Sequence, residues 1–338
     1  MSTVLSRRRF LTISAAAAGV ALLPGALLSS PVRAAIAGPH VWRGAALGAD
    51  AAIQLHHPDP AQADRLIRLC LEEVARLEKV FSLYRADSAL ARLNRDGELH
   101  DPPGDLVRLL EEAVAWGRRS AGAFDVTVQP LWQLYAGHFA RPGADPAGPP
   151  AAAVEAARRL VDHRALRVSA ERISFARRGM AVTLNGIAQG YVTDRVAERL
   201  RAEGMTRVLV DLGEIHALDG HPDGRPWTVG LEDPLRGGPG ATLAVENRAV
   251  ATSGGYGTRF DAAGRFTHLF DPASGRSAAR WAAVTVLASD ATTADALSTA
   301  LSVLPEDRAA GLLRGRSDLA ARLTRHDGGV FTLGSLAS

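Results

Sequence analysis

Apolar side chains recur at the helical period along several parts of the chain. Leu66, Cys70, Val74, Leu77 and Phe81 follow one another at spacings of three and four, which predicts a helix over 64–81 with one buried face. Similar stretches predict further helices over 105–119, 151–160, 187–203 and 293–304. The last of them should end before Pro305, because proline does not fit a helix interior.

Short runs rich in β-branched and aliphatic residues predict strands between and after these helices. They lie at 180–184, 208–212, 227–231, 244–251, 267–270, 282–288 and 330–333. Because helices and strands mix without a regular βαβ rhythm or an internal repeat, we expect an α+β fold, mostly antiparallel sheet with long packed helices. The stretch 141–150, rich in proline and glycine, is expected to be a surface loop and not a domain linker. One domain over 38–338 follows.

The first 37 residues differ in character from the rest. Arg7, Arg8 and Arg9 precede an apolar, alanine-rich run over 13–28 that Pro24 interrupts. This order predicts a twin-arginine signal peptide over 1–37, with small residues near its end that suit cleavage. A permanent membrane anchor is the alternative, which the short, interrupted run disfavours. We therefore expect a protein of the bacterial periplasm that is not itself transmembrane after processing.

Composition excludes several kinds of chemistry. The 338-residue chain has a net charge of +3 that the leader arginines supply, so no nucleic-acid-binding surface is indicated. Lys79 is the only lysine and lies in a helical pattern, which excludes a P-loop and argues against a Schiff-base lysine. Cys70 is the only cysteine, so an intrachain disulfide and a cysteine-rich metal site are excluded. The absence of GxSxG, HExxH and GxGxxG argues against nucleophile-elbow hydrolases, zincins and dinucleotide dehydrogenases.

Two segments offer metal-binding or reactive side chains. Asp295 and Thr299 share one face of a predicted helix, and two oxygen ligands there suit a hard cation such as Mg2+. Alternatively, Thr292 is the N-cap and Asp295 lies at N3, a capping-box arrangement without a metal. His268 should lie near the Thr-Ser-Gly turn at 252–254 and could exchange a proton there. Its alternative role is to satisfy the Asp-Pro turn that follows it.

Three further segments combine glycine with polar or aromatic side chains. Segment 183–191 should lead a strand into a helix whose N-terminus can attract a phosphate. Segment 122–130 offers the ring of Phe124 and the carboxylate of Asp125 beside a glycine. Segment 81–94 contains Tyr84 and a plausible helix cap at Ser88 or Asp87. Each segment could instead be an ordinary turn, with Tyr84 as a half-buried packing residue.

Taken together and in this order, these segments resemble the ApbE family of FAD:protein FMN transferases, from about residue 42 to the end. They correspond to the family's patterns fS-x-Y…dS…lN, G-x-fDvTv-x-P, dLgGiakGy-x-x-D, aTSG-x-y, H-x-x-DP-x-tG and aDalaTal. The resemblance implies an ApbE-like (T-fold-like) architecture and Mg2+ bound by the Gly186 carbonyl, Asp295 and Thr299. It also implies an FAD site lined by Leu47, Tyr84, Ala123, Phe124, Asp125, Thr183, Gln189 and Thr267.

The chain departs from the family patterns at a few positions. Gln189 stands where many members have lysine or glutamate, Thr183 where aspartate is common, and Gly255 where an acid often follows the Thr-Ser-Gly turn. The usual Gly-Gly-Asp-like turn reads Gly213-Glu-Ile. These departures indicate a subgroup with its own partner, similar to exported members that serve nitrous-oxide-reductase assembly.

The reaction implied by the resemblance is Mg2+-dependent transfer of FMN from FAD to a Thr or Ser hydroxyl of an exported or membrane-bound flavoprotein, with AMP leaving. Attack by a hydroxyl on a phosphorus between negative oxygens requires charge neutralisation and a base. His268 is the candidate base. An FAD pyrophosphatase that yields FMN and AMP, and a non-catalytic periplasmic flavin-binding or delivery protein, are the alternatives that the departures keep open.

Overall fold

The computed structural model describes residues 38–336, so the predicted signal peptide lies outside the described residues. The α-helices are α1 (Pro60–Phe81), α2 (Ala89–Asp96), α3 (Gly104–Arg119), α4 (Gln129–Phe139), α5 (Ala151–Arg158), α6 (Ala188–Ala202), α7 (Ala291–Val303) and α8 (Glu306–Leu313). The strands are β1 (His40–Ala46), β2 (Ala49–Leu55), β3 (Glu98–His100), β4 (Leu166–Val168), β5 (Arg172–Phe175), β6 (Val208–Asp211), β7 (Ile215–Leu218), β8 (Trp227–Glu232), β9 (Pro239–Val245), β10 (Ala249–Ser253), β11 (Phe270–Asp271), β12 (Arg276–Ser277), β13 (Ala283–Ala288), β14 (Ala320–Thr324) and β15 (Val330–Leu333).

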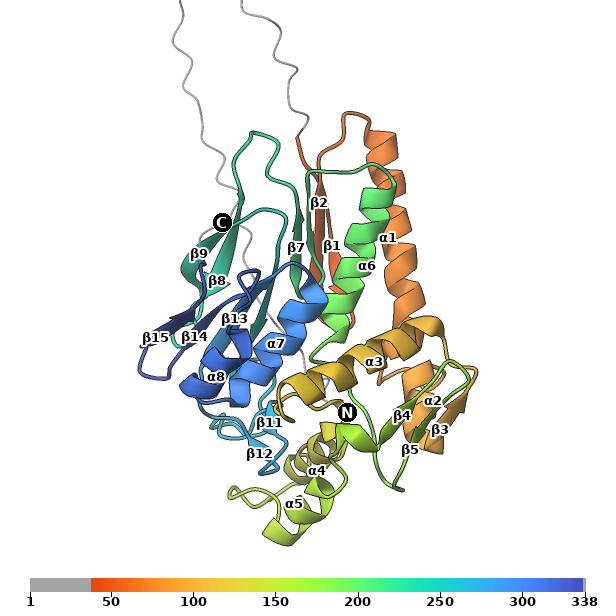
Figure 1. Cartoon of the computed structure of the whole chain (residues 1–338), viewed down its shortest axis with the longest axis vertical. Helices are drawn as coiled ribbons and strands as arrows, with labels where there is room; N and C mark the ends of the chain where they lie inside the picture. The colour runs from red at the N-terminus through yellow and green to blue at the C-terminus, as the bar shows by residue number, and fades with distance from the viewer. Residues whose placement is uncertain (1–37, 337–338) are drawn as a thin grey trace, which may run out of the picture.

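An eight-stranded sheet forms the centre of the molecule, in the order β1-β2-β6-β7-β10-β13-β14-β15. All neighbouring strands in it are antiparallel. Helices α1, α6 and α7 cover one face of this sheet (Figure 1). The expected α+β fold, with long helices against a mostly antiparallel sheet, is confirmed.

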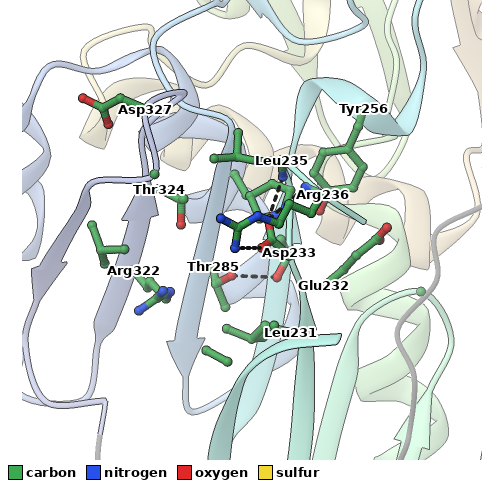
Figure 2. A pocket seen from close by; sticks show the side chains of 18 residues that line it. Leu231, Glu232, Asp233, Leu235, Arg236, Tyr256, Thr285, Arg322, Thr324 and Asp327 are labelled. Atoms are coloured by element: carbon green, nitrogen blue, oxygen red, sulfur yellow. Dashed lines mark hydrogen bonds and ion pairs between the residues drawn. The ribbon is translucent and has the colours of Figure 1, made fainter. Parts of the chain in front are cut away.

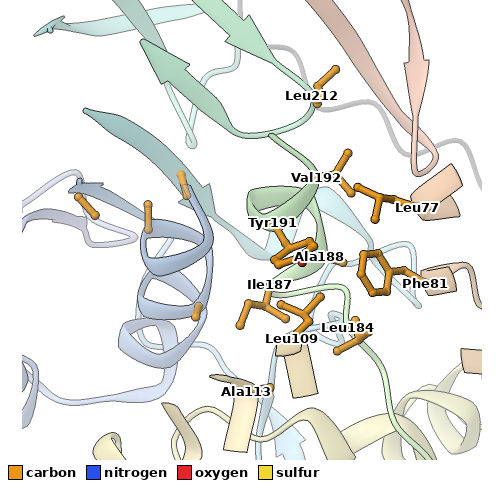
Figure 3. Close-up of a cluster of buried hydrophobic side chains, with 14 of the residues drawn as sticks. Leu77, Phe81, Leu109, Ala113, Leu184, Ile187, Ala188, Tyr191, Val192 and Leu212 are labelled. Atoms are coloured by element: carbon orange, nitrogen blue, oxygen red, sulfur yellow. The ribbon is translucent and has the colours of Figure 1, made fainter. Parts of the chain in front are cut away.

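The helical layer holds the N-terminal end of α6 in a fixed place. Helix α1 begins at a proline, and the Asp59 side chain caps it by accepting from the backbone N–H of Ala61 at 2.8 Å. Figure 3 shows Leu77 and Phe81 of α1 beside Tyr191 at the start of α6. The rings of Phe81 and Tyr191 meet edge to face, 5.6 Å between centroids.

The opposite face of the sheet is partly covered by the β8–β9 hairpin. Because side chains alternate along a strand, one set of residues in β10 and β13 faces the helices and the other faces the hairpin. Val250 and Leu287 belong to the second set and pack against Trp227 and Val229 of the hairpin in a separate apolar cluster.

An aromatic cluster around α4 anchors the segment that carries His268. The Tyr135 ring lies 5.1 Å from Phe270 and 5.8 Å from Phe266, measured between centroids. Its hydroxyl donates to the carbonyl of Gly275 at 3.3 Å. The chain on both sides of His268 is therefore packed in place.

Two strand predictions are wrong in part. Residues 180–184 form no strand, since Val182 exchanges two hydrogen bonds with the Asn94 side chain and the Thr183 amide donates to the Val126 carbonyl. The predicted strand over 244–251 is two strands, β9 and β10, which a turn containing Asn247 at φ 49° separates.

One further strand prediction is wrong in part, and the predicted burial of Cys70 is confirmed. Of the strand predicted at 267–270, Phe270 alone belongs to a strand, β11, while Thr267 forms an isolated bridge with Arg259. Cys70 is buried, as its helical position indicated, and burial raises the pKa of its thiol to about 12. This thiol is therefore protonated and unreactive at neutral pH.

Candidate functional site

Two cavities meet at the turn before α6, and Asn185 lines both. The first, the Phe124 cavity, holds about 60 Å³ and contains these predicted site residues: Ala123, Phe124, Asp125, Thr183, Gly186, His268 and Thr299. The second, the Tyr84 cavity, holds about 200 Å³ and contains Leu47, Tyr84 and Gln189. Thr267 and Asp295 line neither cavity and are buried. The structure therefore brings segments from most of the chain to one place.

Close backbone packing shapes the turn that both cavities share. A Cβ at Gly186 would lie 2.8 Å from Oγ1 of Thr299, so only glycine lets the turn approach α7 this closely. Four residues later, a Cβ at Gly190 would lie 2.2 Å from the carbonyl oxygen of Ala291. The glycines of segment 183–191 thus bring the start of α6 against α7.

Asp295 lies at this contact between helices. Its Oδ2 accepts from the backbone N–H of Gly190 at 3.1 Å, so the carboxylate stabilises the N-terminus of α6. The alternative interpretation, a capping box, is wrong, because the N-cap of α7 is Asp290, which accepts from the Thr293 amide at 2.7 Å. The Thr292 hydroxyl donates to Asp194 instead, at 2.6 Å.

The oxygen atoms near this contact suit a hard cation. Thr299 lies one turn after Asp295 on α7, and Gly186 lies against Thr299. Oγ of Ser253 is 3.3 Å from Oγ1 of Thr299. Carboxylate, hydroxyl and carbonyl oxygens are the donors that Mg2+ accepts, and with few protein ligands it keeps water or substrate oxygens. In the described part of the chain no group of three His, Cys, Asp or Glu residues could hold a metal.

His268 also lines the Phe124 cavity. Its Nδ1 is 3.2 Å from the carbonyl oxygen of Thr258, and its backbone amide donates to the same oxygen at 3.1 Å. Because a carbonyl can only accept, Nδ1 carries the hydrogen in that bond, which leaves Nε2 as the basic nitrogen of the neutral ring. Ser253, in the predicted Thr-Ser-Gly turn, lines the same cavity. The expected proximity of His268 and this turn is confirmed.

Asp125 uses its carboxylate within the protein. Oδ1 accepts from the Thr127 amide and hydroxyl at 2.8 and 2.5 Å, and Oδ2 accepts from the His163 amide at 2.9 Å and lies 3.0 Å from its Nδ1. Asp125 also lines the Phe124 cavity, so its expected contact with a ligand stays a prediction. The carboxylate orders the loop that places Phe124.

The residues of the Tyr84 cavity are held in unusual positions. Tyr84 is 72% exposed, so the half-buried packing role is wrong for it. Leu47 has a φ of 48°, and its amide donates to Oε1 of Glu78 at 2.8 Å. Gln189 lies against Gly213, where a Cβ would come 2.6 Å from Nε2 of the glutamine. A ring exposed beside a cavity is well placed to stack on a flat ligand.

Some cavity residues were not singled out from the sequence. Asn185 and Ser253 are polar residues inside segments already noted, and their place beside glycine was the available signal. Trp132 also lines the Phe124 cavity, but in sequence it is one of several aromatic residues of a helix. Thr267, in contrast, was predicted, and its buried Oγ1 has no hydrogen-bond partner within residues 38–336.

Comparisons with known proteins agree with this geometry. The ApbE family profile matches residues 47–323. The FAD:protein FMN transferase of Haemophilus influenzae is 34% identical over 268 residues, 76% of this chain and 77% of the relative. That of Vibrio cholerae is 33% identical over 255 residues, 73% of each.

Solved structures show the same architecture. The ApbE protein of Thermotoga maritima superposes with a TM-score of 0.77 at 25% identity, covering 87% of this chain and 97% of the other. The flavinyl transferase ApbE of Pseudomonas stutzeri superposes with a TM-score of 0.72 at 28% identity, covering 88% and 96%. This chain belongs to the ApbE family.

Proposed function

We propose that the protein transfers FMN from FAD to a Thr or Ser hydroxyl of a partner flavoprotein, releasing AMP, and that it requires Mg2+. The observation that carries the proposal is the meeting of His268, the turn at Asn185 and Gly186, and the Asp295–Thr299 face of α7 around two cavities that share Asn185. Relatives named FAD:protein FMN transferase support it over most of the chain.

Such a transfer requires one bond to form, one bond to break and one proton to be accepted. The acceptor oxygen forms a bond to the phosphorus of the FMN half, and the bond from that phosphorus to the oxygen of AMP breaks. The proton of the acceptor hydroxyl goes to Nε2 of His268, whose other nitrogen is fixed by the Thr258 carbonyl. AMP leaves with its phosphate oxygens negatively charged.

A cation site next to the turn completes the proposal. Asp295, Thr299 and the Gly186 carbonyl would hold Mg2+, which when bound offsets the charge of phosphate oxygens. The exposed ring of Tyr84 and the Leu47 backbone would hold the flavin, and Phe124 the other end of the dinucleotide. Gln189 and Thr183 do not provide the charges common in the family at their positions.

We also propose that the protein acts in the periplasm after twin-arginine export. An exported or membrane-bound flavoprotein would then be its acceptor, as for members that serve nitrous-oxide-reductase assembly. None of the helices within residues 38–336 has the length and apolar character of a membrane span.

Product analysis tests the proposed reaction against its alternatives. The protein without its leader is incubated with FAD, Mg2+ and candidate acceptor domains, and flavin fluorescence is recorded in a denaturing gel. Covalent fluorescence on the acceptor supports the transferase. Free FMN and AMP in its place would identify a pyrophosphatase, and FAD that is bound but intact would identify a flavin-binding or delivery protein. Asp290→Asn, which retains the cap of α7, is the matched control for site variants.

A further inference from the structure

A third cavity lies on the hairpin side of the sheet, away from the helices. It holds about 300 Å³, and we name it the Arg322 cavity. Its floor consists of strand residues Thr252, Thr285, Arg322 and Thr324, and its wall is the end of the β8–β9 hairpin, residues 231–236. Figure 2 shows Thr285, Arg322 and Thr324 on the sheet, with Leu235 and Arg236 across from them.

The floor is polar where the neighbouring sheet surface is apolar. Thr252, Thr285 and Arg322 lie side by side on adjacent strands. Two residues along the same strands and on the same face, Val250 and Leu287 pack under the hairpin. The change from apolar to polar is therefore specific to the cavity.

Within residues 38–336, one cation and one anion of the cavity, Arg322 and Glu232, have side chains that make no hydrogen bond or ion pair. Arg322 is half-buried, and among the described residues no hydrogen bond or ion pair to its guanidinium is found. Glu232 also has no cationic partner in the described part of the chain, and burial raises the pKa of its carboxyl. A partly buried guanidinium is stabilised by a carboxylate or phosphate that accepts from its fork of donors.

The Arg322 cavity adjoins the proposed transfer site through the sheet. Thr252 lines the Arg322 cavity, while Ser253, the next residue, lines the Phe124 cavity on the other face. Gly213 lines the Arg322 cavity and lies against Gln189 of the Tyr84 cavity. The Arg322 cavity and the proposed transfer site thus share the end of β10 and the contact between Gly213 and Gln189.

The charged residues that line the Arg322 cavity favour a polypeptide acceptor over a nucleotide as its ligand. Asp233 is paired with Arg236 at 3.9 Å, whereas Glu232 and Asp327, which also line the cavity, would repel a phosphate chain with several negative charges. A polypeptide can offer one carboxylate to Arg322 and N–H groups or a basic side chain to Glu232. We propose that the Arg322 cavity binds an acidic side chain of the acceptor protein and so positions its hydroxyl segment. This proposal rests on the proposed function.

Peptide binding without FAD tests this proposal separately from the transfer. The probes are capped, glycine-rich octapeptides that contain one Thr and one Glu. The Glu stands one to four residues before or after the Thr. In two matched peptide series, Gln or Lys replaces the Glu. Binding to the wild type, Arg322→Gln and Arg322→Glu is measured by calorimetry. Arg308→Glu is the matched control, since Arg308 is exposed on α8 and lies outside the cavity.

We expect the wild type to bind a Glu peptide about tenfold more tightly than its Gln twin. Arg322→Gln should lose this preference, Arg322→Glu should prefer Lys, and the control should behave as the wild type. Affinity for FAD should be the same in all four proteins. Equal or no binding of the three peptide series to the wild type would overturn the proposal, as would a tenfold loss of FAD affinity in Arg322→Gln. A failure of flavin transfer with the peptide preferences intact would overturn only the proposed function.

Discussion

A single backbone carbonyl decides which nitrogen of His268 can act as a base. The Thr258 oxygen accepts from both the amide and Nδ1 of His268, so the ring orientation and its tautomer are fixed together. A histidine that served only the following Asp-Pro turn would not need to face the Phe124 cavity, which it lines.

His268→Asn should slow the chemical step by about a hundredfold or more, since general base catalysis contributes this much. An amide can still donate to Thr258, so the melting temperature and FAD affinity should change little. Single-turnover flavin transfer measured across pH should lose an ionisation in the neutral range. His100→Asn, a change at an exposed histidine in β3, is the control. A rate profile that the mutation leaves unchanged would remove His268 from the mechanism.

Asp295→Asn should retain the fold and lose transfer at ordinary Mg2+ concentrations. The amide oxygen can still accept from Gly190, whereas the negative charge that a cation requires is gone. We expect the Mg2+ concentration for half-maximal transfer to rise by about tenfold to a hundredfold. The check is a Mg2+ titration of the rate next to a thermal melt. Normal transfer at ordinary Mg2+ with a lower melting temperature would mean that Asp295 acts only as a helix cap.

At the level of elements, α6 and α7 cap each other. Asp194 of α6 accepts from the Ala291 and Thr292 amides, both at 2.8 Å, and it pairs with His216. Asp295 of α7 accepts from the Gly190 amide in return. The two helix starts that flank the proposed Mg2+ site are thereby fixed to one another.

Asp194→Ala should lower the free energy of unfolding by about 2–4 kcal/mol, because two amides, a hydroxyl and a buried imidazole lose their acceptor. Asp290→Ala removes an ordinary cap of α7 and should cost about 1 kcal/mol. Urea denaturation of both variants measures the difference. Equal losses would show that the reciprocal capping contributes nothing special.

Local patterns predicted the long helices well because their buried faces repeat at the helical period, as in α1 and α3. They failed where a partner distant in sequence decides the structure. Asn94 satisfies the backbone of Val182, which would otherwise suit a strand. Asp194, 98 residues from Thr292, takes the hydroxyl that local rules assigned to a cap.

The sequence identified the segments that carry the site residues, but not the contacts that these residues make. The order of motifs pointed to Phe124, His268 and Thr299, which meet at one cavity. That Asp125 turns its carboxylate to His163 depends on a residue 38 positions away and has no local signal. Arg322 was overlooked, although a charged residue between apolar positions of a strand is a usable sign of a polar cavity.

For the whole molecule, the buried Asp211 should make stability depend on pH. Burial raises the pKa of its carboxyl from 3.8 to about 7. The folded state therefore holds a proton that the unfolded state releases, and this contribution to stability is lost as pH rises from about 4 to 7.

Asp211→Asn should resemble the wild type in stability below about pH 4 and exceed it near pH 8, by up to a few kcal/mol. The amide mimics the protonated acid and can accept from the Gly213 amide. Denaturant unfolding of both proteins at both pH values shows how the difference in their free energies of unfolding changes with pH. Asp96→Asn is the control. The Arg95 hydrogen bond lowers the pKa of Asp96, so removing this carboxylate should not raise the stability at pH 8. The same stability difference at both pH values would contradict the assignment.

Export is predicted from the leader sequence alone, since residues 1–37 lie outside the described structure. Replacing Arg7 and Arg8 by lysine should keep the precursor in the cytoplasm, because the translocon receptor reads the arginine pair. Cell fractionation checks this, with a lysine at Arg33 as the control. Undiminished accumulation in the periplasm would refute the twin-arginine assignment.

The most direct test of the central claim is the intact mass of an acceptor domain after incubation with the protein, FAD and Mg2+, with the released AMP counted in the same sample. The account predicts that the acceptor gains the mass of one FMN less one water, with one AMP released for each acceptor modified. AMP and free FMN in equal amounts beside an acceptor of unchanged mass would contradict it.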